Sequence, residues 1–169
     1  MKSQKDRGTK TEALSLRLDP KTKFILEFVS RINGQKITTI VERAIRGSCD
    51  EVRIEGEEND FQGPNWKHFW DPDEGVRTLK LLAFPDYPTT YDEDELKSFT
   101  EVHKPFFYLQ EFGGQTPDRS LVQILWPKIE EYRKIWRDQL DKDYWAAGNA
   151  MAADLKAAKI KPPAWPSQA

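Results

Sequence analysis

The stretch that decides the fold is ALSLRLDPKTKFILEFVSRINGQKITTIVERAI, residues 13–45. In residues 13–18 leucine alternates with alanine, serine and arginine, and an apolar residue at every second position predicts a strand with one apolar face. Asp19 is a residue type that caps helix N-termini, and Pro20 suits the first helical position. The next apolar residues recur at helical spacing, which predicts a helix: Phe24, Ile25, Phe28, Val29 and Ile32.

A second helix is expected after Asn33 and Gly34. Both residues tolerate the left-handed backbone conformation that closes a helix C-terminus, so the first helix should stop there. Gly47 predicts that the second helix ends near Ser48 or a little later. Its apolar residues again share one helical face: Ile37, Ile40, Val41, Ala44 and Ile45.

The strand of residues 13–18 has no partner nearby in the sequence. A single strand with an unpaired edge is unstable, so it needs a second strand. The simplest partner is the same strand of a second copy, running antiparallel about a two-fold axis. The leucines would then face the helices, and Ala13, Ser15 and Arg17 of both copies would face outward. The sequence therefore predicts a homodimer.

The order of strand, Asp-Pro start, helix, Asn-Gly turn and helix resembles the ribbon-helix-helix family of DNA-binding proteins, the class of the Arc and MetJ repressors. The resemblance covers residues 13–48, and Arg17 lies 17 residues before Gly34, as in the Arc-type pattern. It implies an obligate dimer whose two-stranded ribbon enters the major groove of double-stranded DNA.

The resemblance also implies which residues would contact DNA. Base edges would meet the outward ribbon positions Ala13, Ser15 and Arg17, and phosphate would meet the start of the second helix: Lys36, Ile37, Thr38 and Thr39. Apart from the resemblance, Thr11 would extend the ribbon by one outward residue that faces bases, and Lys10 of the basic arm would add a phosphate contact. The chemistry fits, because an arginine can donate two hydrogen bonds to guanine and the amides at a helix start suit a phosphate oxygen. Ala13 departs from the family pattern, which usually has a longer polar residue at the first outward position. It can only touch a thymine methyl group or leave a gap.

Charge divides the chain into two modules. Residues 1–50 carry 11 Lys and Arg against 6 Asp and Glu, whereas residues 51–169 carry 15 against 22. A basic head of this kind suggests a polyanionic partner. All six tryptophans lie at or beyond Trp66. We therefore predict these segments: a flexible basic arm (1–12), a ribbon-helix-helix domain (13–49), a linker (50–65), a helical Trp-rich domain (66–162) and a tail (163–169).

The expected fold is mainly α. In the Trp-rich domain, Asp71 and Pro72 are expected to open a helix, and the carboxylates of residues 92–95 suit the start of another. Pro105 should interrupt that helix. The following FFYLQEF (106–112) fits either a helix or a strand, and we favour a helix. From Leu121 the sequence is strongly helical to the lysine at 159, with a break near Pro127. We recognise no family for this domain.

Several kinds of function are disfavoured. The single Cys49, with His68 and His103 far apart, gives no metal-ligand spacing, so neither a metal nor another cofactor is expected. Neither a Gly-rich phosphate loop nor a nucleophile elbow occurs, so an enzyme is not expected. No apolar run approaches a membrane helix, and no signal peptide follows the N-terminus, so we expect a cytoplasmic protein without a membrane partner.

These observations favour a sequence-specific transcriptional regulator, a repressor that reads an inverted repeat as a dimer. Two alternatives stay open. One is an antitoxin that binds a toxin through its C-terminal part and represses its own operon. The other is a plasmid accessory protein for partition or DNA transfer, which would bind arrays of repeats. A higher oligomer, a protein partner or a small ligand of the Trp-rich domain stay open as well.

Overall fold

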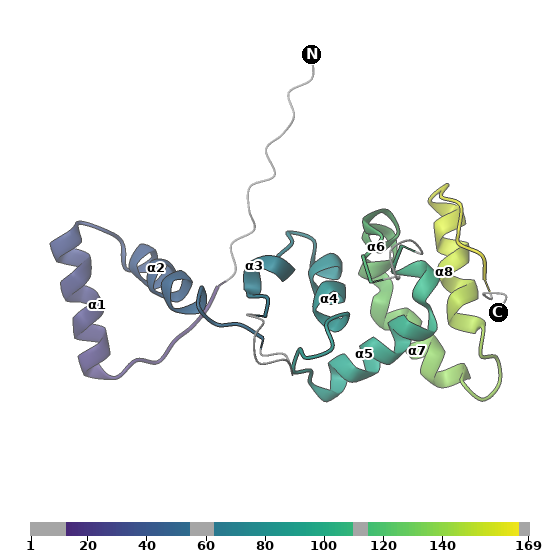
Figure 1. Ribbon diagram of the computed structural model, residues 1–169, viewed down its shortest axis with the longest axis horizontal. Helices are drawn as coiled ribbons and strands as arrows, with labels where there is room; N and C mark the ends of the chain where they lie inside the picture. Colours follow the sequence, from purple (N-terminus) through teal and green to yellow (C-terminus); the bar gives the residue numbers. More distant parts are fainter. Residues whose placement is uncertain (1–12, 55–62, 110–114, 166–169) are drawn as a thin grey trace, which may run out of the picture. The chain divides into compact units, whose positions relative to one another are not determined.

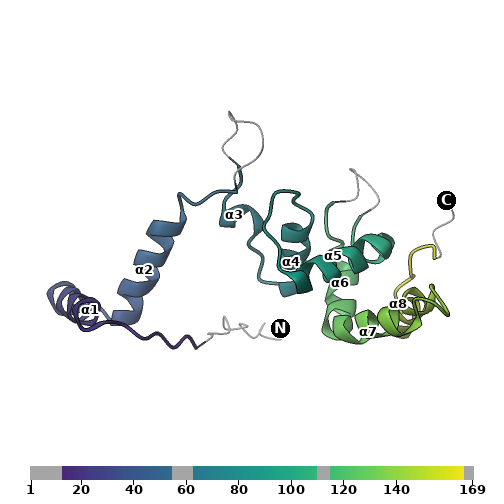
Figure 2. The same cartoon turned by 90° about the horizontal axis from the view of Figure 1, so that it is seen from below.

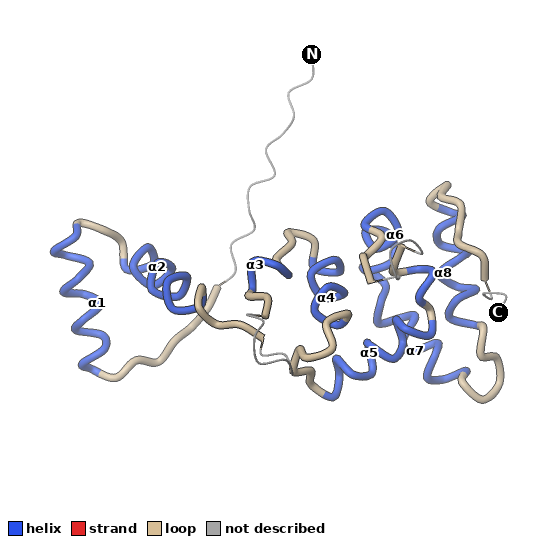
Figure 3. The backbone as a smooth tube through the Cα atoms, viewed as in Figure 1, coloured by secondary structure: helices blue, strands red, loops and turns tan. Residues whose placement is uncertain are grey.

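The computed structural model describes residues 13–54, 63–109 and 115–165, and within these ranges the chain is mainly α-helical (Figures 1 and 3). It divides into two compact units, unit 1 (residues 1–49) and unit 2 (residues 50–169). The described residues contain no strand and only two isolated β-bridges, Arg53 with Asn65 and Tyr108 with Pro117. None of the described helices is both long and apolar enough to cross a membrane.

Unit 1 consists of an extended segment and two helices, α1 (Pro20–Asn33) and α2 (Ile37–Cys49), as Figure 2 shows. The predicted start of α1 is confirmed, because the Asp19 carboxylate accepts hydrogen bonds from the amides of Lys21 and Thr22 at 2.9 and 3.1 Å. The predicted stop is confirmed too, because Gly34 has a left-handed φ of 59°. Local signals therefore set both ends of α1.

The strand expected over residues 13–18 does not appear in the single chain. These residues are exposed and run into α1 without secondary structure. The physical reason is that a strand is held by hydrogen bonds to a neighbouring strand, and unit 1 offers none within one chain. Pairing with a second copy stays a prediction.

Unit 2 is a small helical domain with its own core. Its elements in chain order are α3 (Trp66–Phe69), α4 (Glu74–Leu82), α5 (Tyr91–Val102), the 3-10 helix η1 (Lys104–Phe106), α6 (Arg119–Leu125), the 3-10 helix η3 (Trp126–Lys128), α7 (Ile129–Gln139) and α8 (Ala146–Ala157). Helix α8 packs against both α6 and α7. The core includes Leu79, Phe99, Val122, Leu125 and Met151, each completely buried.

The segment assigned as a linker contributes to unit 2 where it is described. The Asp50 carboxylate accepts hydrogen bonds from the Trp66 indole at 3.1 Å and from the Lys67 ammonium at 2.8 Å. The Asn65 side chain donates to the Asp50 carbonyl at 3.1 Å. These contacts hold residues 50–54 and 63–65 against the start of α3, and the rest of that segment lies outside the described residues.

The helix predicted to open at Asp71 starts later. Asp73 is the N-cap of α4, and its carboxylate accepts from the Val76 amide at 3.1 Å. The Asp71 side chain is buried and forms ion pairs with Lys80 and Arg119 instead. Both aspartates are good capping residues, and the long-range partner Arg119 decides between them.

The remaining predictions for unit 2 are confirmed in part. Thr90 caps α5 in a reciprocal capping box with Glu93, and η1 begins at the residue before Pro105. The helix expected over residues 106–112 is wrong for residues 107–109, because the Leu109 amide donates to the Thr116 carbonyl at 2.9 Å across a loop. Residues 110–112 lie outside the described residues.

The long helical stretch from Leu121 breaks at Pro127 as expected, and also at residues 140–145, which was not expected. The Asp143 carboxylate accepts from the Trp145 amide at 3.1 Å, so the chain turns before α8. Trp165, in the predicted tail, packs against His103, Phe106 and Trp145 with ring centroids 5.1, 5.4 and 5.3 Å apart.

Candidate nucleic-acid interface

The predicted base-contacting residues lie in the extended segment that precedes α1. Ala13, Ser15 and Arg17 are all exposed. Within the described part of the chain, no hydrogen bond or ion pair engages the Arg17 guanidinium, so its donors stay available. Thr11 and Lys10 lie, with the basic arm of residues 1–12, outside the described residues.

Asp19 fixes where this segment meets α1. Besides its two backbone contacts, its carboxylate accepts a hydrogen bond from the Thr22 hydroxyl at 2.6 Å. The hydrogen bond from Thr22 holds the pKa of the Asp19 carboxyl below its usual range. The cap is therefore charged at neutral pH, and Arg17 stands two residues before a fixed helix start.

The predicted phosphate-contacting residues lie at the start of α2, and Ser30 fixes the turn that leads there. The Ser30 carbonyl accepts from the Gln35 amide at 3.0 Å, and its hydroxyl donates back to the Gln35 carbonyl at 2.6 Å. All four residues at the start of α2 are exposed: Lys36, Ile37, Thr38 and Thr39. The first amides of a helix have no intrahelical acceptor, so they are free to bind an anion.

Within one chain the structure does not bring the two sets of residues together. Arg17 precedes α1 and Lys36 follows it, and a helix of 14 residues is about 21 Å long. One chain therefore offers two separate polar sites. Residues 13–49 carry 7 Lys and Arg against 3 Asp and Glu, so the field around both sites is positive.

The apolar side chains of unit 1 are not buried in the single chain. In the described part of unit 1, neither α1 nor α2 has a buried residue. Phe24 and Phe28, two of the apolar residues at helical spacing in α1, stack on each other with ring centroids 6.2 Å apart but remain 65% and 55% exposed. The exposed apolar set, between 43% and 74% exposed, is Leu14, Leu16, Leu18, Phe24, Ile25, Phe28, Ile32, Ile37 and Ile45.

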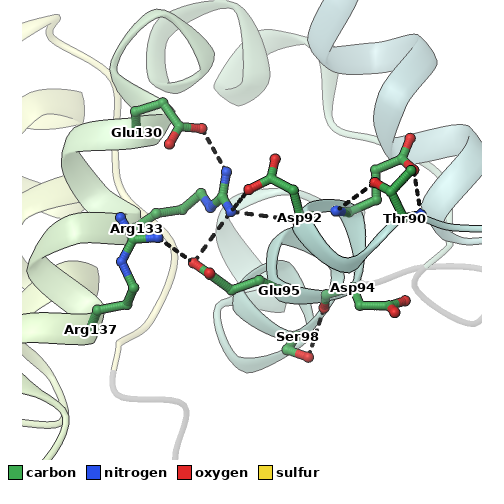
Figure 4. A network of polar contacts seen from close by, with 9 residues as sticks. Thr90, Asp92, Asp94, Glu95, Ser98, Glu130, Arg133 and Arg137 are labelled. Carbon is green, nitrogen blue, oxygen red and sulfur yellow. Dashed lines mark hydrogen bonds and ion pairs between the residues drawn. The ribbon is translucent and has the colours of Figure 1, made fainter.

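Unit 2 contains a polar cluster that the sequence analysis missed (Figure 4). Arg133 on α7 is buried, and its guanidinium contacts Asp92 Oδ1 at 2.8 Å, Glu95 Oε1 at 3.3 Å and Glu130 Oε1 at 2.7 Å. Arg137, one turn later, contacts Glu95 at 2.7 Å. The run of carboxylates at residues 92–95 gave the only signal, and it was assigned to the helix start alone. We call these five residues the Arg133 cluster.

The two histidines lie in different surroundings, one buried and one exposed. His103 is completely buried, and its Nδ1 donates to the Phe99 carbonyl at 2.9 Å. Burial lowers the pKa of its imidazole below the ordinary value. His68 is exposed beside Phe69. Among the described residues, no group of three or more His, Cys, Asp or Glu is placed to hold a metal ion.

Comparison of the chain with protein-family models, with curated proteins and with solved structures found no match. The residues of unit 1 and their exposure are therefore what bears on function.

Proposed function

We propose that the chain is a DNA-binding transcriptional regulator of the ribbon-helix-helix type, a repressor that reads an inverted repeat in the major groove as a homodimer. The single observation that carries the proposal is the exposure of the apolar set of unit 1. A module in which none of the described apolar side chains is buried needs a partner surface of matching size.

A second copy of unit 1 supplies that surface by symmetry. Each of the nine side chains in the exposed apolar set is about half exposed, and covering the rest contributes on the order of 1 kcal/mol each. The total, on the order of 10 kcal/mol per chain, is comparable with the whole stability of a small domain. Pairing of residues 13–18 about the two-fold axis would also satisfy their backbone groups.

A dimer paired in this way would present polar side chains on its outer surface, where they can contact DNA. If Leu14, Leu16 and Leu18 turn onto the helices, the alternation of a strand turns Ser15 and Arg17 of both copies outward. Two arginines on a two-stranded ribbon suit the major groove, where guanine accepts a bidentate pair. The start of α2 adds backbone amides and the side chains of Lys36 and Thr38 for phosphate.

Unit 2 favours a regulator over an antitoxin. Toxin-binding segments are often disordered until they bind, whereas unit 2 packs around its own buried core. In this proposal unit 2 sets the oligomeric state or receives a signal. A partition or transfer protein would use the same interface, but it would select arrays of repeats in place of a single site.

Selection of bound DNA from a random pool, with purified chain at near-physiological salt, tests the proposal. The expected result is an inverted repeat. Arg17→Ala should weaken binding to that site about thirtyfold or more, since each lost bidentate contact costs about 1–3 kcal/mol and the dimer loses two. The matched control is Arg46→Ala, which removes an exposed arginine in the last turn of α2 and should bind normally. Enrichment of no sequence would overturn the proposal.

A further inference from the structure

A partly open cleft of about 320 Å³ lies in unit 2, between the α3–α4 region and the chain at residues 115–117. This volume is at the lower end of the range for small-molecule sites in proteins. The cleft has no role in the function proposed for unit 1, so the two can be tested separately.

One side of the cleft is apolar. Phe69 and Phe84 meet edge to face with ring centroids 5.6 Å apart, and Ala83 and Pro117 extend the same lining. Phe69 is buried, whereas Phe84 and Pro117 are only partly covered. The apolar part of a ligand can therefore cover the surface of Phe84 and Pro117 that is now in contact with water. Removing apolar surface from water is favourable.

The cleft wall also carries one positive charge. Lys80 lines it, and the Lys80 ammonium contacts Asp71 Oδ2 at 3.5 Å. Arg119 binds the same Oδ2 atom, and Oδ1 accepts from the Asp73 amide at 3.0 Å. One carboxylate thus faces two cations. The long Lys80 contact leaves donors of that ammonium free, because a lysine has three.

A third cation, Arg77, also contacts Asp71, although neither Arg77 nor Arg119 lines the cleft. The Arg77 guanidinium donates to the Asp71 carbonyl at 3.4 Å and lies over the Trp70 ring, 5.6 Å from its centroid. Unit 2 as a whole has 15 Lys and Arg against 23 Asp and Glu, so the lysine in the cleft wall has the opposite sign to the average charge of the unit. Such a local reversal of sign suits an anionic ligand.

We propose that this cleft binds a small organic carboxylate with an aromatic body, whose carboxylate accepts a hydrogen bond from Lys80 Nζ while its ring lies on Phe84 and Pro117. The charge selects an anion, and the apolar lining selects a ring in place of an inorganic ion. The ligand class is therefore an aryl or arylalkyl carboxylic acid.

Titration of the ¹⁵N-labelled full chain with 3-phenylpropionate tests the proposal. Saturable shifts are expected for the amides of residues 68–69, 80–84 and 115–116. Two matched probes separate the two interactions, because 3-phenylpropionamide keeps the ring without the charge and propionate keeps the charge without the ring. Both should bind at least about tenfold more weakly, which is the effect of losing one charged hydrogen bond or the burial of one ring.

A variant pair tests the role of Lys80. Lys80→Met keeps the apolar stem and should weaken 3-phenylpropionate binding about tenfold, whereas Lys134→Met, at an exposed position on α7, should not. If Lys80→Met unfolds, as circular dichroism would reveal, the comparison of acid with amide on the wild-type chain decides alone. The proposal is overturned if the acid and the amide bind equally, if shifts do not localise to the cleft, or if folded Lys80→Met binds as the wild type does.

Discussion

Arg133→Met should destabilise unit 2 far more than the same change at Arg137, one turn away. Both arginines contact Glu95, but the Arg133 side chain is 2% exposed and the Arg137 side chain is 48% exposed. Arg133 has two further acceptors, Asp92 and Glu130, which are mostly exposed. The two positions therefore form a matched pair that differs in burial and in number of partners.

The magnitude follows from which groups can return to water. A hydrogen bond between charged groups contributes about 1.5–3 kcal/mol, but Asp92 and Glu130 can be rehydrated once Arg133 is gone, which offsets part of the loss. We therefore expect Arg133→Met to cost about 2–3 kcal/mol and Arg137→Met only about 0.5 kcal/mol, the typical value of an exposed pair. For a unit of this size, these losses correspond to decreases in melting temperature of about 10 °C for Arg133→Met and about 2 °C for Arg137→Met.

Thermal and urea unfolding followed by circular dichroism measures both effects. Added salt should reduce the loss of stability caused by Arg137→Met, because screening acts mainly on exposed charges. Most of the loss caused by Arg133→Met should remain. The hydrogen bond from Arg133 holds the pKa of the Asp92 carboxyl below its usual range, so its contribution is present above about pH 4 and is lost as the pH falls further. Equal losses for the two variants would refute the reasoning from burial.

Three further predictions concern His103, Gly148 and the ribbon. Because burial lowers the pKa of His103, the stability of unit 2 should fall as the pH drops below about 6.5, and His103→Phe should reduce this loss in urea unfolding at pH 7.5 and 5.5. Gly148→Ala would place a methyl group 2.1 Å from the Trp165 ring, so it should displace that ring and cost about 1–3 kcal/mol, measured by denaturation and tryptophan fluorescence. Leu16→Glu should abolish the dimer in analytical ultracentrifugation, because it places a charge beneath the proposed ribbon.

Two of these predictions have a control in the chain, and the third has an outcome that would contradict it. His68→Phe alters an exposed histidine and should leave the pH dependence between 7.5 and 5.5 unchanged. Gly47→Ala meets open space and should be neutral or slightly stabilising in a helix. A dimeric, DNA-binding Leu16→Glu protein would show that the strand register is wrong by one residue.

What the sequence predicted well depends on contacts between near neighbours. Asp19 and Gly34 set the ends of α1 through atoms two to five residues away, and these signals could be read directly. The same logic failed at Asp71, since both Asp71 and Asp73 can cap a helix. Arg119, 48 residues further on, takes the first of them, and no local pattern reveals that.

Burial was the property that the sequence described least well. Arg133 looks like any arginine on an amphipathic helix, and its partner Asp92 lies 41 residues earlier. Conversely, Phe24 and Phe28 recur at the spacing typical of a buried helix face, but both are exposed in the single chain. Helical spacing predicts which residues share a face, and it does not say whether another part of the same chain or a second chain will cover that face.

The exposed apolar set of unit 1 also has a consequence for the lifetime of the protein in a cell. Quality-control proteases degrade chains in proportion to the fraction that is unfolded or open. If a second copy covers these side chains, an unpaired chain is the vulnerable form and a paired chain is protected. Dilution during growth would then raise the fraction of unpaired chains and speed their degradation, so that the supply of the protein would decay faster than cell division alone dictates.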